Sequence, residues 1–397
     1  MRLPVAILSS FLQFGLVLIV RAEAPAGPRI DWNTLAAPSN DLKILRIDPA
    51  PSLPAGATRM LLPTPAPNLV AAWWVEGSAH RAIPWLFNHD ATRLELELPP
   101  GPSPMGASVA LEISERTTQF PDGRIVFSAL DAQVQGRQAR LESHPGNHRI
   151  GFWTDPTDTV SWNYQPTRWG RYDVALCYAA EGGDGTEVEV EVGGRRLRAV
   201  RPSTGSWYRY TTLPVGRVYL ANSDPFTLRV GCSRPQAGAV MNLKAVVLRP
   251  APEGEPIVQA ASGVVTLAAR DAITHGTHLR YEPATNKNCL GYWTQPRDWA
   301  EWEFTVNRPG EFRVEVWQGC GKGQGGSEVM VEAGGARLSF TVEDTGHFQN
   351  FVPRQLGTVT FPATGVHTLA IRPQKKKAAA IMDIRQVLLL PAGVASK

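Results

Sequence analysis

Apolar and polar residues alternate along short segments of this chain, and turn residues separate the segments. Every second residue is apolar in YDVALCY (172–178), and FRVEVW (312–317) repeats the pattern. A period of two is typical of half-buried strands. Residues 121–250 and 257–392 contain no convincing amphipathic helix pattern. The hydrophobic pattern therefore predicts an all-β protein.

Glycine pairs separate some of these predicted strands. Gly193-Gly194 lies between alternating runs in TEVEVEVGGRRLRAV, and Gly334-Gly335 does the same in SEVMVEAGGARLSFTV. A glycine pair suits a two-residue hairpin turn because both residues adopt positive φ without steric cost. Many short strands joined by such turns predict a β-sandwich of the jelly-roll type.

The chain also repeats itself over a complete domain. Residues 150–172 (IGFWTDPTDTVSWNYQPTRWGRY) match residues 290–312 (LGYWTQPRDWAEWEFTVNRPGEF) at an offset of 140, which becomes 141 after a glycine-rich stretch. A match of this length with one insertion indicates a duplicated domain. The offset pairs Asp131 with Asp271, Trp153 with Trp293, Trp162 with Trp302, Trp207 with Phe348, and Asn242 with Asp383.

These observations divide the chain into three predicted β-sandwich domains. A smaller sandwich is expected over residues 23–120, the first copy of the duplicated module over 121–250, and the second over 257–392. The linker RPAPEGEP (249–256) is rich in proline and charge, as expected between domains.

Residues 1–22 are interpreted as a secretory signal peptide. A positive residue is followed by an apolar stretch, and Val20-Arg21-Ala22 fits a small-x-small cleavage site. Cleavage after Ala24 and an uncleaved membrane anchor are the alternatives. No other stretch is apolar enough to span a bilayer, so we expect a secreted or periplasmic protein. The absence of an N-glycosylation sequon is consistent with a bacterial source.

Composition supports this view and argues against nucleic acid as a partner. The 397 residues include 36 glycines and 33 prolines, and the net charge is only +4. Removing Arg2 and Arg21 with the signal lowers the basic count from 40 to 38, against 36 acidic residues. A nearly neutral protein lacks the positive field that nucleic-acid binding needs.

Four cysteines in an exported chain suggest two disulfides. Cys177 and Cys232 lie in the first copy, and Cys289 and Cys320 lie in the second at unmatched positions. Pairing within each copy is therefore favoured, and four buried free thiols are the alternative.

The sequence offers little catalytic or metal-binding chemistry. It contains no G-x-S-x-G, no H-E-x-x-H and no glycine-rich loop that leads into a helix. His275 and His278 would point to opposite faces of a strand, so they do not suggest a metal site. We therefore expect neither enzymatic activity nor a metal.

Aromatic side chains are the more informative class. Their faces can pack against the C–H patches of sugar rings, while amides and charged groups bond the hydroxyls. Trp162 and Trp302 are predicted to lie in the core. Seven residues are candidates for ligand binding: Trp153 and Trp293 before a turn, Trp207 and Phe348 after a glycine turn, Trp317 out of phase on its strand, and the polar Gln349 and Lys322.

The repeated pattern resembles a known family. It runs D-x-x-x-W-x-aromatic, Gly-x-aromatic, Gly-Gly, Thr-Gly with an aromatic, and a final Met-Asn/Asp-Leu/Ile. It is similar to the galactose-binding-like β-sandwiches, such as family 6 and family 35 carbohydrate-binding modules. The tandem arrangement resembles modules appended to secreted bacterial α-L-fucosidases and sulfatases. Residues 23–120 resemble the small C-terminal sandwich of α-L-fucosidases.

The resemblance implies sugar binding at loop tips, where Trp207 and Phe348 match one aromatic position. The family's aromatic on the glycine-rich loop has no clear counterpart. The chain has no barrel domain, so fucosidase activity is not implied. The resemblance also implies calcium near Asp131 and Asp271, but Leu130 and Arg270 replace the ligating glutamate. No cofactor is therefore expected, with structural calcium left as an open alternative.

The sequence thus favours a secreted, non-catalytic protein whose tandem modules bind polysaccharide by aromatic stacking. The alternatives are a structural or protein–protein interaction module of the cell surface, an accessory subunit of a glycosidase, and a glycosidase with an unfamiliar site. The oligomeric state is not indicated.

Overall fold

The structure is a computed structural model that describes residues 44–47, 57–76, 79–88, 92–100, 107–236 and 238–393. The expected signal peptide lies outside these residues. The described residues form strands and two short 3-10 helices, Ala129–Asp131 and Ala269–Asp271, which confirms the all-β prediction. No helix in this part of the chain is both long and apolar enough to cross a membrane.

The second copy is a two-sheet sandwich around its own core. One sheet has the order β20-β25-β30-β27-β28 with β22 on β25, and the other has the order β23-β24-β31-β26-β29 with β21 on β31. The strands are β20 (Ile257–Val258), β21 (Val265–Ala268), β22 (Ile273–His275), β23 (Arg280–Glu282), β24 (Cys289–Gly291), β25 (Trp299–Val306), β26 (Gly310–Cys320), β27 (Glu328–Ala333), β28 (Ala336–Thr341), β29 (His347–Phe361), β30 (Gly365–Lys375) and β31 (Asp383–Pro391).

The first copy repeats this arrangement. Its sheets have the orders β10-β13-β18-β15-β16 and β11-β12-β19-β14-β17, with β9 on β19 and β8 on β9. The strands are β8 (Thr118–Gln119), β9 (Ile125–Ser128), β10 (Gln133–Gln135), β11 (Arg140–Glu142), β12 (Arg149–Gly151), β13 (Thr159–Tyr164), β14 (Gly170–Ala180), β15 (Thr186–Val192), β16 (Arg195–Arg201), β17 (Ser206–Leu220), β18 (Phe226–Arg234) and β19 (Asn242–Pro250).

The two copies agree in detail as well as in strand order. Pairing with the following long strand shifts register after Val174 in the first copy and after Val314 in the second, which are equivalent positions. The predicted hairpin at Gly193-Gly194 joins β15 to β16, and both glycines have positive φ, 56° and 72°. Trp162 and Trp302 are buried, with 2% and 0% of their surface exposed, as predicted for core residues.

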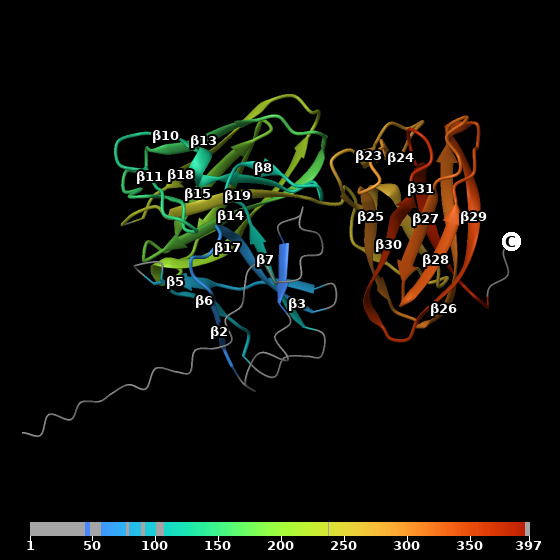
Figure 1. The fold of residues 1–397 in the computed structure, drawn as a ribbon, viewed down its shortest axis with the longest axis horizontal. Helices are drawn as coiled ribbons and strands as arrows, with labels where there is room; N and C mark the ends of the chain where they lie inside the picture. The colour runs from blue at the N-terminus through green and yellow to red at the C-terminus, as the bar shows by residue number, and fades with distance from the viewer. Residues whose placement is uncertain are drawn as a thin grey trace, which may run out of the picture.

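The N-terminal strands form a sandwich that shares a sheet with the first copy. One sheet has the order β1-β7-β3-β4, and the strands β5-β6-β2 continue the sheet of the first copy through pairing of β5 with β17. Figure 1 shows these strands beneath the first copy, with the second copy to one side. They are β1 (Ile44–Ile47), β2 (Arg59–Leu62), β3 (Leu69–Glu76), β4 (Ala79–Ala82), β5 (Trp85–Phe87), β6 (Leu94–Glu97) and β7 (Ser108–Ile113).

The C-terminal half of strand β14 is consequently buried on both faces. Leu176 points into the core of the first copy, whereas Cys177 and Ala179 belong to the N-terminal core. The equivalent face of β26 carries Trp317, which is half-buried and donates its indole N–H to Glu315 Oε1 at 2.8 Å. The small thiol of Cys177 thus lies where a second layer packs above the strand, and the large Trp317 lies where none of the N-terminal strands does.

All four cysteines are free thiols, so the expected disulfides are not present. Cys177 lies on β14 and faces the N-terminal core, whereas Cys232 lies on β18 in the opposite sheet. In the second copy, Cys320 belongs to the hydrophobic core, and Cys289 contacts Asp383. The alternative of free, mainly buried thiols is the one the structure supports.

The repeated aspartate of the T-x-P-x-D stretch has a structural role. Asp158 is buried and accepts hydrogen bonds from the backbone N–H groups of Arg137, Gln138 and Ala139 at 2.7–2.9 Å. Asp298 does the same for residues 277–279. A buried carboxylate with three backbone donors is well satisfied, so this motif fixes a loop in both copies.

The two copies are joined by a polar contact as well as by the linker. Arg168 is 2% exposed, and its guanidinium donates to Thr274 Oγ1 at 2.5 Å and to the Thr274 carbonyl at 3.0 Å. Beside it, the Arg280 guanidinium stacks over the Trp169 ring at 3.7 Å. These contacts hold the second copy against the first in a defined orientation.

Candidate functional site

The repeated Gly-aromatic-Trp stretch places its two aromatic residues in opposite environments. Trp153 and Trp293 are 0% and 1% exposed and belong to the two cores. The structure therefore does not present these two predicted site residues to a ligand. The residues just before them, Phe152 and Tyr292, are 50% and 43% exposed.

Backbone geometry explains this reversal. Phe152 and Tyr292 have φ values of 51° and 57°, in the left-handed region that non-glycine residues rarely adopt. The turn directs each tryptophan inward and the residue before it outward. Such uncommon conformations cluster at functional sites. The sequence did contain a signal, because an aromatic residue occupies this position in both copies.

An arginine covers one face of each exposed ring. The guanidinium carbon of Arg140 lies 3.7 Å from the Phe152 ring centre, and that of Arg280 lies 3.6 Å from the Tyr292 ring centre. Arg280 also stacks on Trp169 of the first copy, whose ring lies 5.2 Å from Tyr292. These cation–π contacts hold each ring in place.

In the first copy, polar side chains lie beside the turn that carries the exposed ring. A methyl group on Gly151 would lie 2.0 Å from Glu142 Oε2 and 3.1 Å from Asn242 Oδ1, so glycine lets both side chains approach the turn. Arg149 Nε bonds Glu142 Oε2 at 3.0 Å. Asn242 donates to the Trp207 carbonyl at 2.8 Å. We call Phe152 with Glu142, Asn242 and Trp207 the aromatic site of the first copy.

The aromatic site of the second copy consists of Tyr292, Glu282, Asp383 and Phe348. A methyl group on Gly291 would lie 2.1 Å from Glu282 Oε1 and 3.4 Å from Asp383 Oδ1. Gln349 donates to Asp383 Oδ2 at 3.1 Å, so this predicted site residue does reach the site. Burial and the negative charge of Glu282 raise the pKa of Asp383 to about 7.

Trp207 and Phe348 are half-buried rather than fully presented. Trp207 packs against the core of the first copy. The Phe348 ring lies directly over the glycine-rich stretch, where a methyl group on Gly321 would be 2.6 Å from it. Both residues therefore serve as packing, and they are linked to the aromatic sites through the hydrogen bonds of Asn242 and Gln349.

The remaining predicted residues lie elsewhere. Trp317 is on the outer face of β26, and Lys322 is exposed on the glycine-rich loop. His275 stacks on Trp299 at 3.8 Å, whereas the His278 ring hydrogen-bonds Thr294 at 2.7 Å. The two histidines are thus committed to different neighbours.

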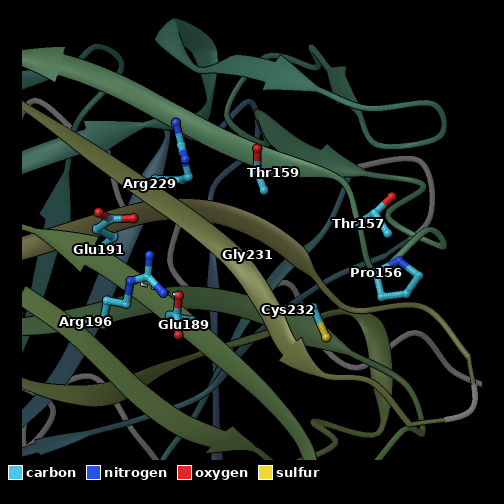
Figure 2. A pocket seen from close by; sticks show the side chains of 9 residues that line it. All are labelled: Pro156, Thr157, Thr159, Glu189, Glu191, Arg196, Arg229, Gly231 and Cys232. Atoms are coloured by element: carbon cyan, nitrogen blue, oxygen red, sulfur yellow. Dashed lines mark ion pairs between the residues drawn. The ribbon is translucent and has the colours of Figure 1, made fainter.

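A separate hollow of about 350 Å³ lies on the outer face of the β13-β18-β15-β16 part of the first copy. Figure 2 shows charged side chains at its floor, where Glu189 is paired with Arg196 at 3.9 Å. Its lining residues include no aromatic ring: Pro156, Thr157, Thr159, Glu189, Glu191, Arg196, Arg229, Gly231 and Cys232.

The second copy has different residues at the centre of this face. Trp299 and Arg372 occupy the positions of Thr159 and Gly231, and the Arg372 guanidinium lies 3.2 Å from the Trp299 ring centre. The hollow therefore depends on residues that the duplication did not keep, whereas the aromatic site has an exposed ring in both copies.

No protein-family model matches this chain, and no curated protein does. Among solved structures, the family 35 carbohydrate-binding module of Clostridium thermocellum is similar at 18% identity and a TM-score of 0.27, over 32% of this chain and 96% of that module. The C-terminal CBM6 of a Zobellia galactanivorans laminarinase shares 15% identity at a TM-score of 0.27, over 32% of this chain and 98% of that one.

A Podospora anserina GH26-CBM35 β-(1,4)-mannanase is similar at 19% identity and a TM-score of 0.28, over 34% of this chain. This chain matches only 29% of the length of that mannanase. Identities and TM-scores at these levels do not assign a function to this chain.

Proposed function

We propose that the protein binds carbohydrate through the aromatic sites of its two tandem modules. One observation carries the proposal: both copies expose an aromatic ring at the same strained position beside buried amide or carboxylate groups. A sugar ring packs its C–H face on an aromatic side chain, and its hydroxyls bond to neighbouring polar groups. A rigid sandwich that holds these groups at a turn suits such recognition.

The protein acts as a binding module rather than as an enzyme in this proposal. Glu282 and Asp383 are the carboxyl pair of the second aromatic site. The first copy has an asparagine, Asn242, in place of the second carboxyl group. Hydrolysis of a glycosidic bond needs a pair of carboxyl groups in one site, so the function that both copies can share is binding.

Two sites on one chain would increase the apparent affinity for a polymer. The buried Arg168 contacts hold the modules in a fixed orientation, so the separation of the two sites is defined. A polysaccharide long enough to reach both would bind more tightly than a short oligosaccharide, because the second binding event is intramolecular. In this proposal the protein is secreted, with a glycan of the cell exterior as its partner.

The test is a binding screen on a broad panel of soluble and insoluble polysaccharides. Wild-type protein is compared with a Phe152→Ala/Tyr292→Ala double variant. The control variant is Val200→Ala/Val366→Ala, which removes apolar side chains that are similarly exposed, 50% and 53%, but lie on other strands. We expect wild type and control to bind at least one polysaccharide and the double variant to lose that binding. Absence of wild-type binding across the panel would instead favour a structural or protein-interaction module.

A further inference from the structure

Three side chains with metal-ligating atoms converge in the second copy. One ligand atom each from Glu282, Cys289 and Asp383 lies within 4.8 Å of the others. The residues are 6%, 0% and 5% exposed. They come from three adjacent strands of one sheet, β23, β24 and β31, so the sandwich itself fixes their spacing.

The first copy has a different set of residues at the same positions. There Glu142 is paired with Arg149 at 3.0 Å, and the third position is Asn242. The duplication therefore provides an internal comparison. The second copy has replaced the guanidinium with a thiol and the amide with a carboxyl group, and Glu282 is paired with Lys287 instead.

The described polar partners of the cluster use one oxygen of each carboxylate. Lys287 bonds Glu282 through Oε2 from a side chain that is 35% exposed. Asp383 accepts its hydrogen bonds at Oδ2, from the Gln349 amide at 3.1 Å and the Cys289 thiol at 3.5 Å. These contacts engage Glu282 Oε2 and Asp383 Oδ2.

One oxygen of each carboxylate faces the same glycine. Glu282 Oε1 and Asp383 Oδ1, the oxygens opposite those used by Lys287 and Gln349, both face Gly291. The absent side chain at Gly291 lets the two oxygens approach the same point.

We propose that Glu282, Cys289 and Asp383 form a three-ligand site for a borderline divalent cation, with Zn²⁺ as the best match. Zinc accepts thiolate and carboxylate ligands and commonly binds three protein ligands plus water. Calcium and magnesium prefer sets made only of oxygens, which a thiolate does not suit. Binding would release the thiol proton. Glu282 and Asp383 also belong to the aromatic site of the second copy, but the titration below measures metal binding with no sugar present, so its failure is distinguishable from a failure of sugar binding.

Titration of the reduced, metal-free full chain with Co²⁺ and then Zn²⁺ tests the site. Cobalt bound by a thiolate gives a sulfur-to-metal charge-transfer band, which carboxylates alone do not give. We expect one equivalent of Co²⁺ to produce the band and Zn²⁺ to remove it by displacing the cobalt. Absence of saturable binding to the wild-type chain would overturn the proposal.

Three variants locate the site. Cys289→Ser should abolish the band, whereas Cys320→Ser, which removes another buried thiol of the same module, should retain it. Asp383→Asn restores the residue type of the first copy and should weaken Co²⁺ binding at least about tenfold. A band that survives Cys289→Ser, or that disappears only in Cys320→Ser, would contradict the assignment. Circular dichroism of each variant establishes that it is folded.

Discussion

Phe152 and Trp153 are consecutive residues whose side chains lie on opposite sides of the backbone, with Phe152 50% exposed and Trp153 fully buried. The positive φ of Phe152, 51°, produces this arrangement. Tyr292 and Trp293 repeat it in the second copy. The repeated stretch thus combines a core residue that builds the fold with an exposed ring available for binding.

These two roles should separate in stability measurements. Trp153→Ala removes a large core side chain and should lower the free energy of unfolding by about 3–5 kcal/mol. Phe152→Ala should change it by less than about 1 kcal/mol, because half of the ring is already in water and its position is strained. Urea denaturation followed by fluorescence or circular dichroism would measure both. Equal losses in the two variants would contradict the distinct roles.

A buried ion cluster joins the N-terminal strands to the first copy and should make stability depend on pH. Glu112 on β7 bonds Arg124 at 2.7 Å and Arg249 on β19 at 2.5 Å. Burial alone would raise the pKa of Glu112, but the two arginines outweigh it and lower the pKa to about 2. The folded pKa is therefore below the unfolded value of 4.5.

Because the pKa of Glu112 is lower in the folded protein than in the unfolded chain, its ionised form stabilises the fold. The contribution of Glu112 is fully present above about pH 4.5 and is lost as the pH falls toward 2. Glu112→Gln should cost about 3–5 kcal/mol at neutral pH, because it removes the buried carboxylate that pairs with both Arg124 and Arg249, and should weaken the acid sensitivity. Asp173→Asn, which breaks an exposed pair with Arg217, serves as the control. Thermal melts from pH 7 to 2 would reveal the difference, and identical profiles for Glu112→Gln and wild type would count against the cluster.

The cysteines give a direct chemical prediction. Unfolding the protein without reductant should expose four titratable thiols, because none is cross-linked. In the folded protein, Cys232 should react first, since it is half-exposed and the others are buried. Burial also raises the pKa of Cys177 to about 12, which slows its reaction further. A thiol assay with and without denaturant would suffice, and a count of zero in the unfolded chain would restore the two-disulfide hypothesis.

Much of the fold was predictable because it depends on local patterns. Alternation placed Leu176 and Val314 in cores, and the glycine pairs marked hairpins. Trp162 and Trp302 were correctly assigned to the interior because they share a face with apolar neighbours. The duplication at offsets of 140 and 141 was readable directly from the sequence.

The features that the sequence did not reveal depend on backbone angles or on distant strands. The recurrence of an aromatic residue at positions 152 and 292 marked these residues, but a positive φ decides that Phe152 faces outward and Trp153 inward. Cys177 is buried because the N-terminal strands pack on its sheet, and this packing of distant strands is not visible in the sequence. The expected signal peptide therefore suggested a disulfide instead. The cluster around Asp383 appears only when three strands are placed side by side.

Titration calorimetry with a polysaccharide from the binding screen tests the central claim most directly. The measurement compares wild type, Phe152→Ala, Tyr292→Ala and the double variant. If both aromatic sites bind one polymer, each single variant should lose at least about tenfold in apparent affinity through lost avidity, and the double variant should show no binding. A double variant that binds as tightly as wild type would contradict the account.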